Sequence, residues 1–164
     1  MRYQVEVPSP DGWSRIRDIR LASLRADPDA FGASYEEQSR WTEGEGRSSM
    51  VTHTYLVVGS EEGDCAVMFI RLTDEDPDAT CWVGGCWTRP NERGHGHLRR
   101  LFTYVDENAQ SHGWQRQGLG VWTHNHGAIG AYERLGFERR AGEIESTSHP
   151  GWFYYRLYRE TFLR

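Results

Sequence analysis

One short stretch constrains the fold of this chain more than any other, the segment 88–98 with the sequence TRPNERGHGHL. It reads in succession as the end of a strand, a turn with glycines at 94 and 96, and the start of a helix. Glycine permits backbone conformations in which successive N–H groups converge, and the first turn of a helix adds the positive end of its dipole. The segment therefore predicts a binding site for a phosphate or a diphosphate.

Two other glycine-rich phosphate loops do not fit this segment. A Walker loop needs a lysine after its last glycine, and the basic residues of this chain are all arginine. The dinucleotide fingerprint needs a third glycine three positions after the second, and that position is Arg99. The pattern that remains is Arg-Gly-x-Gly-x, from Arg93 to His97, at the mouth of an amphipathic helix.

A second motif lies downstream, from Asn125 to Phe137, with the sequence NHGAIGAYERLGF. On a helix that begins at Asn125, residues 125, 128 and 132 share one face, because steps of three and four residues stay on one side. Asn125 suits the N-cap of this helix, and Gly136 suits its C-terminal end. One face of the helix can therefore meet one ligand.

Together the two motifs resemble those of the GCN5-related N-acetyltransferases (GNAT family). The coenzyme A loop of that family reads Arg-Gly-x-Gly-x-(Gly or Ala) after a Val-x-Pro strand end, and its later motif reads Asn-x-x-Ala-x-x-x-Tyr-x-x-x-Gly-Phe. Here Thr88-Arg89-Pro90 stands in place of Val-x-Pro and Leu98 in place of the Gly or Ala, while the second motif matches at every named position. The resemblance implies an enzyme that moves an acetyl group directly from acetyl-CoA to a primary amine.

The resemblance also implies the GNAT fold, an α/β architecture in which a mixed sheet of about seven strands is flanked by about four helices. Residues 1–164 would form a single domain of this kind. In the family the sheet splays between its fourth and fifth strands, and the pantetheine arm of the coenzyme enters the gap. Those strands are predicted here at 80–88 and 118–123.

Apolar spacing and turn residues predict the elements in the order β, α, α, β, β, β, α, β, α, β, β. A helix starting near Gly96 follows the phosphate loop, another starts at Asn125, and a mobile polar loop is expected over 42–49. The remaining expected helices span 13–26 and 29 to about 41, and the expected strands span 3–7, 55–58, 65–72, 80–88, 118–123, 137–145 and 152–159.

The resemblance assigns the coenzyme to a strand end, a loop and a helix. Backbone groups of the strand end pair with the pantetheine amides, and backbone N–H groups of the loop cradle the diphosphate. The second helix supplies further coenzyme contacts, and its tyrosine is the candidate general acid for the leaving thiolate. The residues concerned are Cys86, Trp87 and Thr88 on the strand, Arg93, Gly94, His95, Gly96, His97 and Leu98 in the loop, and Asn125, Ala128 and Tyr132 on the helix.

Two of these roles have plain structural alternatives. Tyr132 could be an ordinary buried helix tyrosine, and Asn125 could be an N-cap with no coenzyme contact. The general base is also open, because the strand 80–88 carries no glutamate, which some members of the family use. A primary amine with a pKa near 10.4 has to lose a proton before it attacks, so some group or water must accept that proton.

The segment from Asp29 to Glu37 is similar to small-molecule members of the family, in which the first two helices and their loop wall the acceptor site. The substrate contacts that this implies are Phe31, Tyr35, Glu36 and Glu37. Glu36 or Glu37 could bind the ammonium group and relay its proton through water. The alternative is that both carboxylates lie on a solvated helix face.

Composition sets limits on partners. A net charge of −5 and a pI of about 5.8 argue against nucleic acid, and a small cationic acceptor, such as an antibiotic, a polyamine or an amino-acid-like amine, is easier to accommodate. No apolar run is long enough for a membrane helix and no signal-peptide pattern is present, so a cytoplasmic location is expected. The aromatic last strand is either core or the interface of a homodimer.

The spacing of the cysteines and histidines does not predict a metal site. Cys65, Cys81 and Cys86 lie in strand-like segments without paired spacing and are expected to be buried free thiols. The pairs His95-x-His97 and His124-x-His126 lack a third ligand nearby in sequence, so no metal is expected. Two alternatives to a small-molecule enzyme stay open, a coenzyme-binding sensor without turnover and a protein N-terminal or lysyl acetyltransferase.

Overall fold

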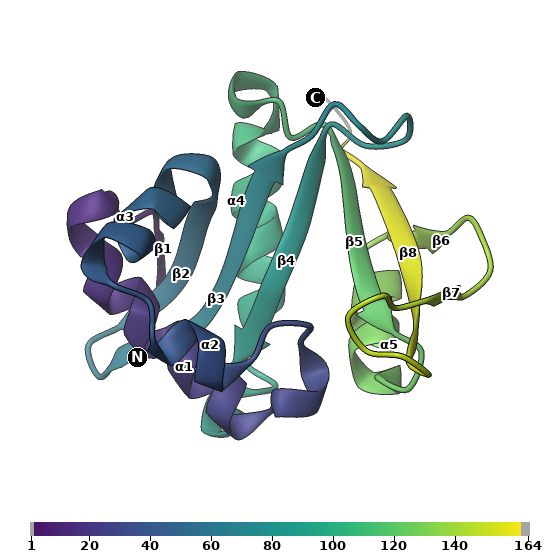
Figure 1. Cartoon of the computed structure of the whole chain (residues 1–164). Coiled ribbons are helices and arrows are strands. Elements are labelled where there is room, and N and C mark those ends of the chain that lie inside the picture. The colour runs from purple at the N-terminus through teal and green to yellow at the C-terminus, as the bar shows by residue number, and fades with distance from the viewer. Residues whose placement is uncertain (1, 162–164) are drawn as a thin grey trace. The chain divides into compact units, whose positions relative to one another are not determined.

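The computed structural model describes residues 2–161 (Figure 1). These residues divide into two compact units. Unit 1 comprises Met1–Arg71 and Gly85–Tyr104, and unit 2 comprises Leu72–Gly84 and Val105–Arg164. Strand β4 and helix α4 each contribute residues to both units. None of the helices within residues 2–161 has the length and apolar character needed to cross a membrane.

The expected mixed α/β architecture is confirmed, with small corrections to the counts. The described residues form eight strands and five α-helices, one more of each than expected. The strand order is β1-β2-β3-β4-β5-β8-β6, with β7 also paired to β8. The strands are β1 (Gln4–Glu6), β2 (Thr54–Ser60), β3 (Gly63–Leu72), β4 (Cys81–Thr88), β5 (Arg116–Trp122), β6 (Glu138–Arg139), β7 (Ile144–Glu145) and β8 (Phe153–Glu160). The helices are α1 (Trp13–Ala26), α2 (Tyr35–Ser39), α3 (Glu43–Thr52), α4 (His97–His112) and α5 (His126–Arg134).

Helix α1 supplies one side of the core of unit 1. Its bounds agree with the sequence prediction, and its buried residues Ile16 and Ile19 pack with Tyr55 and Val57 of β2 and with Val67 of β3. The helix ends before Pro28 because a residue that precedes a proline is disfavoured in the helical conformation. The apolar face of α1 thus covers the β2–β3 hairpin.

The predicted loop over 42–49 is wrong, because this segment starts helix α3. The Thr42 side chain accepts a hydrogen bond from the Glu45 backbone N–H, and the Glu45 side chain accepts one from the Thr42 backbone N–H. This capping box satisfies two N–H groups at the helix start and outweighs the low helix propensity of two glycines. The second predicted helix is also shorter than expected, since only Tyr35–Ser39 is α-helical.

Strands β5 and β8 form the centre of unit 2. They are antiparallel from Arg116↔Glu160 to Trp122↔Tyr154. Strand β5 also pairs in parallel with β4, through three residues of β4 that end at Val83↔Leu119. The predicted fourth and fifth strands of the sheet are therefore neighbours, and their parallel pairing is confined to the beginning of β4.

The single strand predicted over 137–145 is also wrong, because the structure has two short strands there. Glu138 pairs with Tyr158 and Ile144 pairs with Tyr154, so six steps along this segment oppose only four along β8. The surplus residues leave the sheet at a bend that includes Ala141. An extra pair of residues cannot be accommodated in a regular antiparallel ladder, and the strand divides into β6 and β7.

Candidate functional site

The phosphate loop lies in unit 1, between the end of β4 and the start of α4. A short 3-10 turn over Pro90–Glu92 leads into the loop, and α4 begins at His97. Gly94 and Gly96 have φ angles of +83° and +77°, a region that L side chains rarely adopt. Within the described residues no acceptor engages the backbone N–H of Gly94, His95 or Gly96. The predicted strand, glycine turn and helix start are confirmed, and these three N–H groups remain available to an anion.

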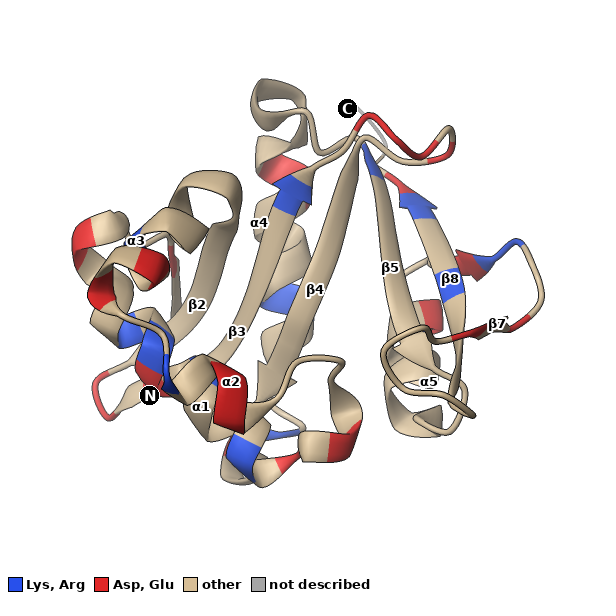
Figure 2. Ribbon diagram, in the orientation of Figure 1, with Lys and Arg blue, Asp and Glu red and all other residues tan. Residues whose placement is uncertain are grey.

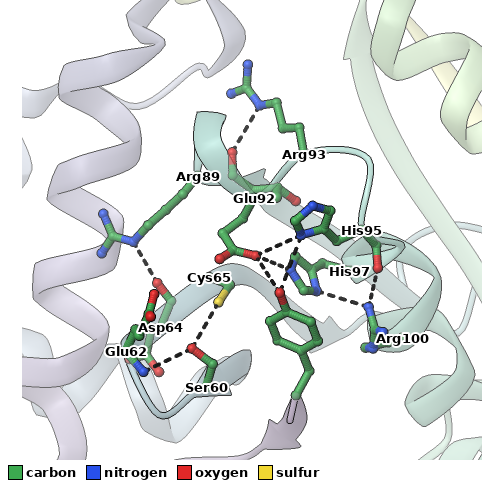
Figure 3. A network of polar contacts seen from close by, with 12 residues as sticks. Ser60, Glu62, Asp64, Cys65, Arg89, Glu92, Arg93, His95, His97 and Arg100 are labelled. Atoms are coloured by element: carbon green, nitrogen blue, oxygen red, sulfur yellow. Dashed lines mark hydrogen bonds and ion pairs between the residues drawn. The ribbon is translucent and has the colours of Figure 1, made fainter. Parts of the chain in front are cut away.

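The Glu92 side chain contacts two histidines at the start of α4 and in the loop before it (Figure 3). Its Oε2 atom accepts hydrogen bonds from the Tyr3 hydroxyl at 3.1 Å and from His97 Nε2 at 3.0 Å, and it lies 3.2 Å from His95 Nδ1. The hydrogen bond from His97, followed by those from Tyr3 and His95, lowers the pKa of Glu92 below its usual 4.5. Two loop side chains and the N-terminal strand region are therefore tied to a single carboxylate.

Arg100 fixes the tautomer of His97. An arginine Nη1 atom can only donate, and that of Arg100 lies 3.2 Å from His97 Nδ1, so the neutral ring carries its proton on Nε2 and donates it to Glu92. The metal-ligating atoms of Cys65, Glu92 and His97 lie within 4.8 Å of one another. In this tautomer, however, His97 has no free lone pair on Nε2 for an ion. Hydrogen bonding accounts for the cluster.

The side chains of two predicted coenzyme residues are engaged with Asp27. Its Oδ2 atom accepts hydrogen bonds from Trp87 Nε1 at 2.7 Å and from Arg93 Nη2 at 2.8 Å. Arg93 Nε also donates to the Thr88 carbonyl at 3.1 Å. These contacts tie the end of α1 to the end of β4. The Arg93 backbone N–H points to the Pro90 carbonyl at 3.4 Å, so the loop N–H groups without an acceptor begin at Gly94.

Strand β4 carries no charged residue (Figure 2). Gly85, near its middle, has a φ of +62°. The expectation of buried free thiols holds for Cys65 and Cys81, whereas Cys86 is only half-buried. Burial raises the pKa of the Cys65 thiol and raises that of Cys81 to about 12, so neither is a reactive thiolate near neutral pH.

Unit 2 holds the second motif on α5. Asn125 is the N-cap, and its Oδ1 atom accepts a hydrogen bond from the Ala128 backbone N–H at 3.3 Å. Gly136, with a φ of +98°, follows the helix end. Tyr132 is the buried residue of this helix, and its ring centroid lies 5.7 Å from that of Phe137. The N-cap role of Asn125 is confirmed by this geometry.

The predicted acceptor residues lie in unit 1, on and beside α2. Glu36 and Glu37 are both exposed, and Glu36 pairs with Arg40 at 2.9 Å. Tyr35 is half-buried and accepts a hydrogen bond from Arg25. The half-buried Phe31 ring centroid is 6.0 Å from the guanidinium carbon of Arg20. Both carboxylates thus occupy the solvated helix face that the sequence left as the alternative.

Two residues of this region have no role in the sequence analysis, Glu92 and Arg20. Glu92 precedes the Arg-Gly-x-Gly pattern, so a motif search does not reach it. Arg20, however, occupies the middle of a series with a step of four, Ile16-Arg20-Leu24, on the buried face of α1. The spacing of apolar residues along α1 therefore shows from the sequence alone that a charged residue lies on the apolar face of this helix.

Comparison with solved structures finds many with the same fold. An acetyltransferase of the GNAT family from Streptococcus pneumoniae matches with a TM-score of 0.78 at 15% identity, covering 98% of this chain and all of that one. Spermidine N-acetyltransferase from Vibrio cholerae, in complex with CoA and spermine, matches with a TM-score of 0.72 at 12% identity over 97% and 95% of the two chains. The ribosomal-protein-S18-alanine N-acetyltransferase from Escherichia coli matches with a TM-score of 0.68 at 14% identity over 99% and 96%.

The family assignment comes from the sequence itself. No protein with a curated description matches it significantly. The sequence model of the acetyltransferase (GNAT) family matches residues 13–137, a range that includes the phosphate loop and the whole α5 motif. The chain therefore belongs to the GNAT family of acetyltransferases, enzymes that use acetyl-CoA.

Proposed function

We propose that this protein transfers an acetyl group from acetyl-CoA directly to the primary amine of a small molecule. The observation that carries the proposal is the loop in which the N–H groups of Gly94, His95 and Gly96 have no acceptor within the described residues. Backbone N–H groups without an acceptor beside a helix start suit a diphosphate, an anionic part of coenzyme A. The His95 and His97 side chains are engaged with Glu92, so the backbone N–H groups are what this part of the loop offers a ligand.

The coenzyme roles follow the family motifs. Backbone groups of Cys86, Trp87 and Thr88 pair with the pantetheine amides, and the N–H groups of the loop from Arg93 to Leu98, including that of His97, bind the diphosphate. This division agrees with the structure of unit 1, in which the side chains of Trp87 and Arg93 are already engaged with Asp27. We assign Asn125, Ala128 and Tyr132 to the coenzyme through their match to the second motif.

The chemistry requires few groups. The neutral amine attacks the thioester carbonyl, a carbon–nitrogen bond forms, and a backbone N–H of β4 stabilises the oxyanion. The carbon–sulfur bond then breaks, Tyr132 protonates the departing thiolate, and the proton that the nitrogen loses on becoming an amide returns to Tyr132 through water. Because β4 has no carboxylate and Glu36 and Glu37 are exposed, water takes the proton of the amine, with either glutamate as a relay.

The acceptor is a small molecule of the antibiotic, polyamine or amino-acid-like kind. The acidic balance of the chain suits an amine that arrives as a cation. A structural neighbour named as a spermidine N-acetyltransferase acts on an amine of this size, whereas another is named for a ribosomal-protein substrate. A peptide acceptor is therefore the competing substrate class.

Thermal unfolding with acetyl-CoA, and with ATP as a control, tests the donor. A ligand at about a hundred times its dissociation constant adds about 2.7 kcal/mol, or several degrees in Tm for a chain of this length. A shift with acetyl-CoA and none with ATP supports the proposal. The absence of any shift with acetyl-CoA contradicts it.

Tyr132→Phe tests the catalytic role once a panel of amines has revealed turnover. We expect kcat to fall by about a hundredfold, the range of a lost general acid, with the acetyl-CoA shift retained. Tyr155→Phe, at a half-buried tyrosine of β8, is the matched control. If no amine is acetylated while acetyl-CoA still binds, the protein is a coenzyme sensor, a function that the uncharged β4 strand also fits.

A further inference from the structure

A small pocket lies within unit 1, between α1, α2 and α3. Its volume is about 30 Å³, room for one or two water molecules or for a carboxylate group. Residues of the segment 42–49 line it, as do parts of α1 and β2. Its aromatic walls are Trp13, Trp41 and Tyr55, and its polar groups include Arg20, Gln38 and Ser49.

Arg20 is the unusual member of this lining. Its Nη1 atom is buried and has no hydrogen-bond partner within the described residues. Its Nη2 atom faces Gln38 Oε1 at 3.5 Å, longer than an ordinary N–H···O bond. No carboxylate of the described residues forms an ion pair with it.

Two aromatic rings also lie near the Arg20 guanidinium. The ring centroids of Phe31 and Phe69 lie 6.0 Å and 5.8 Å from its guanidinium carbon. Burial lowers its pKa, but a guanidinium remains charged in any protein environment. Arg20 as a whole is half-buried, but its Nη1 atom is buried, and a buried donor without an acceptor is unfavourable.

The backbone of β4 places Arg20 beside the segment assigned to the coenzyme. A Cβ atom on Gly85 would lie 2.5 Å from Arg20 Nη1, so the guanidinium occupies the space that a side chain would fill. The next residue, Cys86, begins the stretch whose backbone is assigned to the pantetheine arm. A group bound by Arg20 therefore lies close to that part of β4.

We propose that Arg20 binds a carboxylate of the acceptor, so that the substrate is a small molecule with a primary amine at one end and a carboxylate at the other. This inference rests on the proposed acetyltransferase function and narrows its acceptor to the amino-acid-like class. The guanidinium offers planar N–H donors that match a carboxylate, and Gln38 and Ser49 supply further polar contacts. The pocket holds the carboxylate, and the carbon chain with its amine extends beyond the volume of about 30 Å³.

Binding of a carboxylate can be tested without turnover. The probes are butanoate and its neutral amide, butanamide, at equal ionic strength in thermal unfolding. We expect butanoate, and not butanamide, to raise the Tm by several degrees near saturation, and we expect Arg20→Met to abolish the rise. Arg25→Met, an arginine on the same helix outside the pocket lining, should keep it. An equal response of the wild type and Arg20→Met would overturn the inference.

Kinetics then test whether the carboxylate belongs to the acceptor. Matched pairs of amines, 4-aminobutanoate with 4-aminobutanamide and β-alanine with β-alaninamide, are compared by release of coenzyme A. We expect the ratio of kcat/KM for each acid to kcat/KM for its amide to be about ten or more in the wild type and about one in Arg20→Met. Turnover without this preference would overturn the inference and leave the proposed function intact. Absence of turnover with every amine would overturn the proposed function, and the butanoate result would then describe a carboxylate site alone.

Discussion

Two arginines, one in each unit, show how differently a guanidinium can be held. In unit 2, Arg159 forms a two-point contact with Asp106 at 2.8 Å and 2.6 Å, and it donates to the Leu135 carbonyl and to Gln117 Oε1 at 2.8 Å each. In unit 1, Arg20 has a buried Nη1 atom without a partner in the described residues. The first has its donors satisfied by the protein, and the second does not.

The difference separates a structural arginine from one that awaits a ligand. A buried polar group is costly when it lacks a partner, and natural proteins tolerate few such groups. Arg159 needs nothing more, because carboxylate, amide and carbonyl oxygens surround it. Arg20 has aromatic rings and the Gln38 amide beside it, and its Nη1 atom has no acceptor in the described residues.

The largest effect is expected for Arg159→Met. The substitution leaves the Asp106 carboxylate without its cation and removes the donor to Gln117 and Leu135. Breaking a largely buried ion pair of this kind should lower the free energy of unfolding by about 3 kcal/mol. Urea unfolding gives the value. A loss below about 1 kcal/mol would mean that Arg159, despite its hydrogen bonds, contributes no more to the stability of the fold than Arg20 does.

A smaller effect is expected for Gly85→Ala, which brings a methyl group against Arg20. The φ of +62° alone should cost about 1 kcal/mol for a non-glycine residue, and the contact with Nη1 should add to it. We expect about 1–2 kcal/mol in urea unfolding. In an Arg20→Met background the steric part should shrink while the backbone part remains. Equal losses in both backgrounds would mean that Arg20 does not fill the space at Gly85.

The sequence predicted the parts of this structure that depend on local chemistry. The bounds of α1, the glycine turn before α4 and the N-cap at Asn125 all follow from residue types that act within a few positions. The segment 42–49 shows the limit of composition, since its glycines indicated a loop and the Thr42–Glu45 capping box made a helix. The Thr-x-x-Glu spacing of a capping box is present in this segment, and it decides the structure more than the number of glycines does.

The candidate site was less predictable, because its key contacts join distant positions. Glu92 meets Tyr3, 89 residues away, and Arg20 lies against Gly85, and neither pairing leaves a periodic signal. The split of 137–145 is likewise decided by register against β8. What the sequence offered was the position of Arg20 on the buried stripe of α1. The absence of a partner for it becomes visible only when its neighbours are known.

A pH-dependent effect is expected at Glu92, a carboxylate that accepts from Tyr3 and His97 and lies beside His95. Its folded-state pKa is lowered, so its contribution to stability is complete above about pH 5.5, where the group is ionised in both states, and is lost as pH falls through that lowered pKa. Glu92→Gln should therefore be less stable than the wild type at pH 7, and the difference should be smaller at pH 3. Urea unfolding at both values measures it. A difference that does not depend on pH would show that the charge of Glu92 does not matter.

The smallest effect is expected for Arg20→Met without ligand. The substitution removes an unpaired buried charge, which favours the folded state, and removes contacts with the Phe31 and Phe69 rings, each worth roughly 0.5–1 kcal/mol, which opposes it. We therefore expect the free energy of unfolding to change by less than about 1 kcal/mol in urea. A loss of 2 kcal/mol or more, on the order of a lost hydrogen-bonded charge, would place Arg20 beside Arg159 as a structural residue. A change near zero means that the fold does not require this guanidinium, and its presence on an apolar helix face then has to be explained by what it binds.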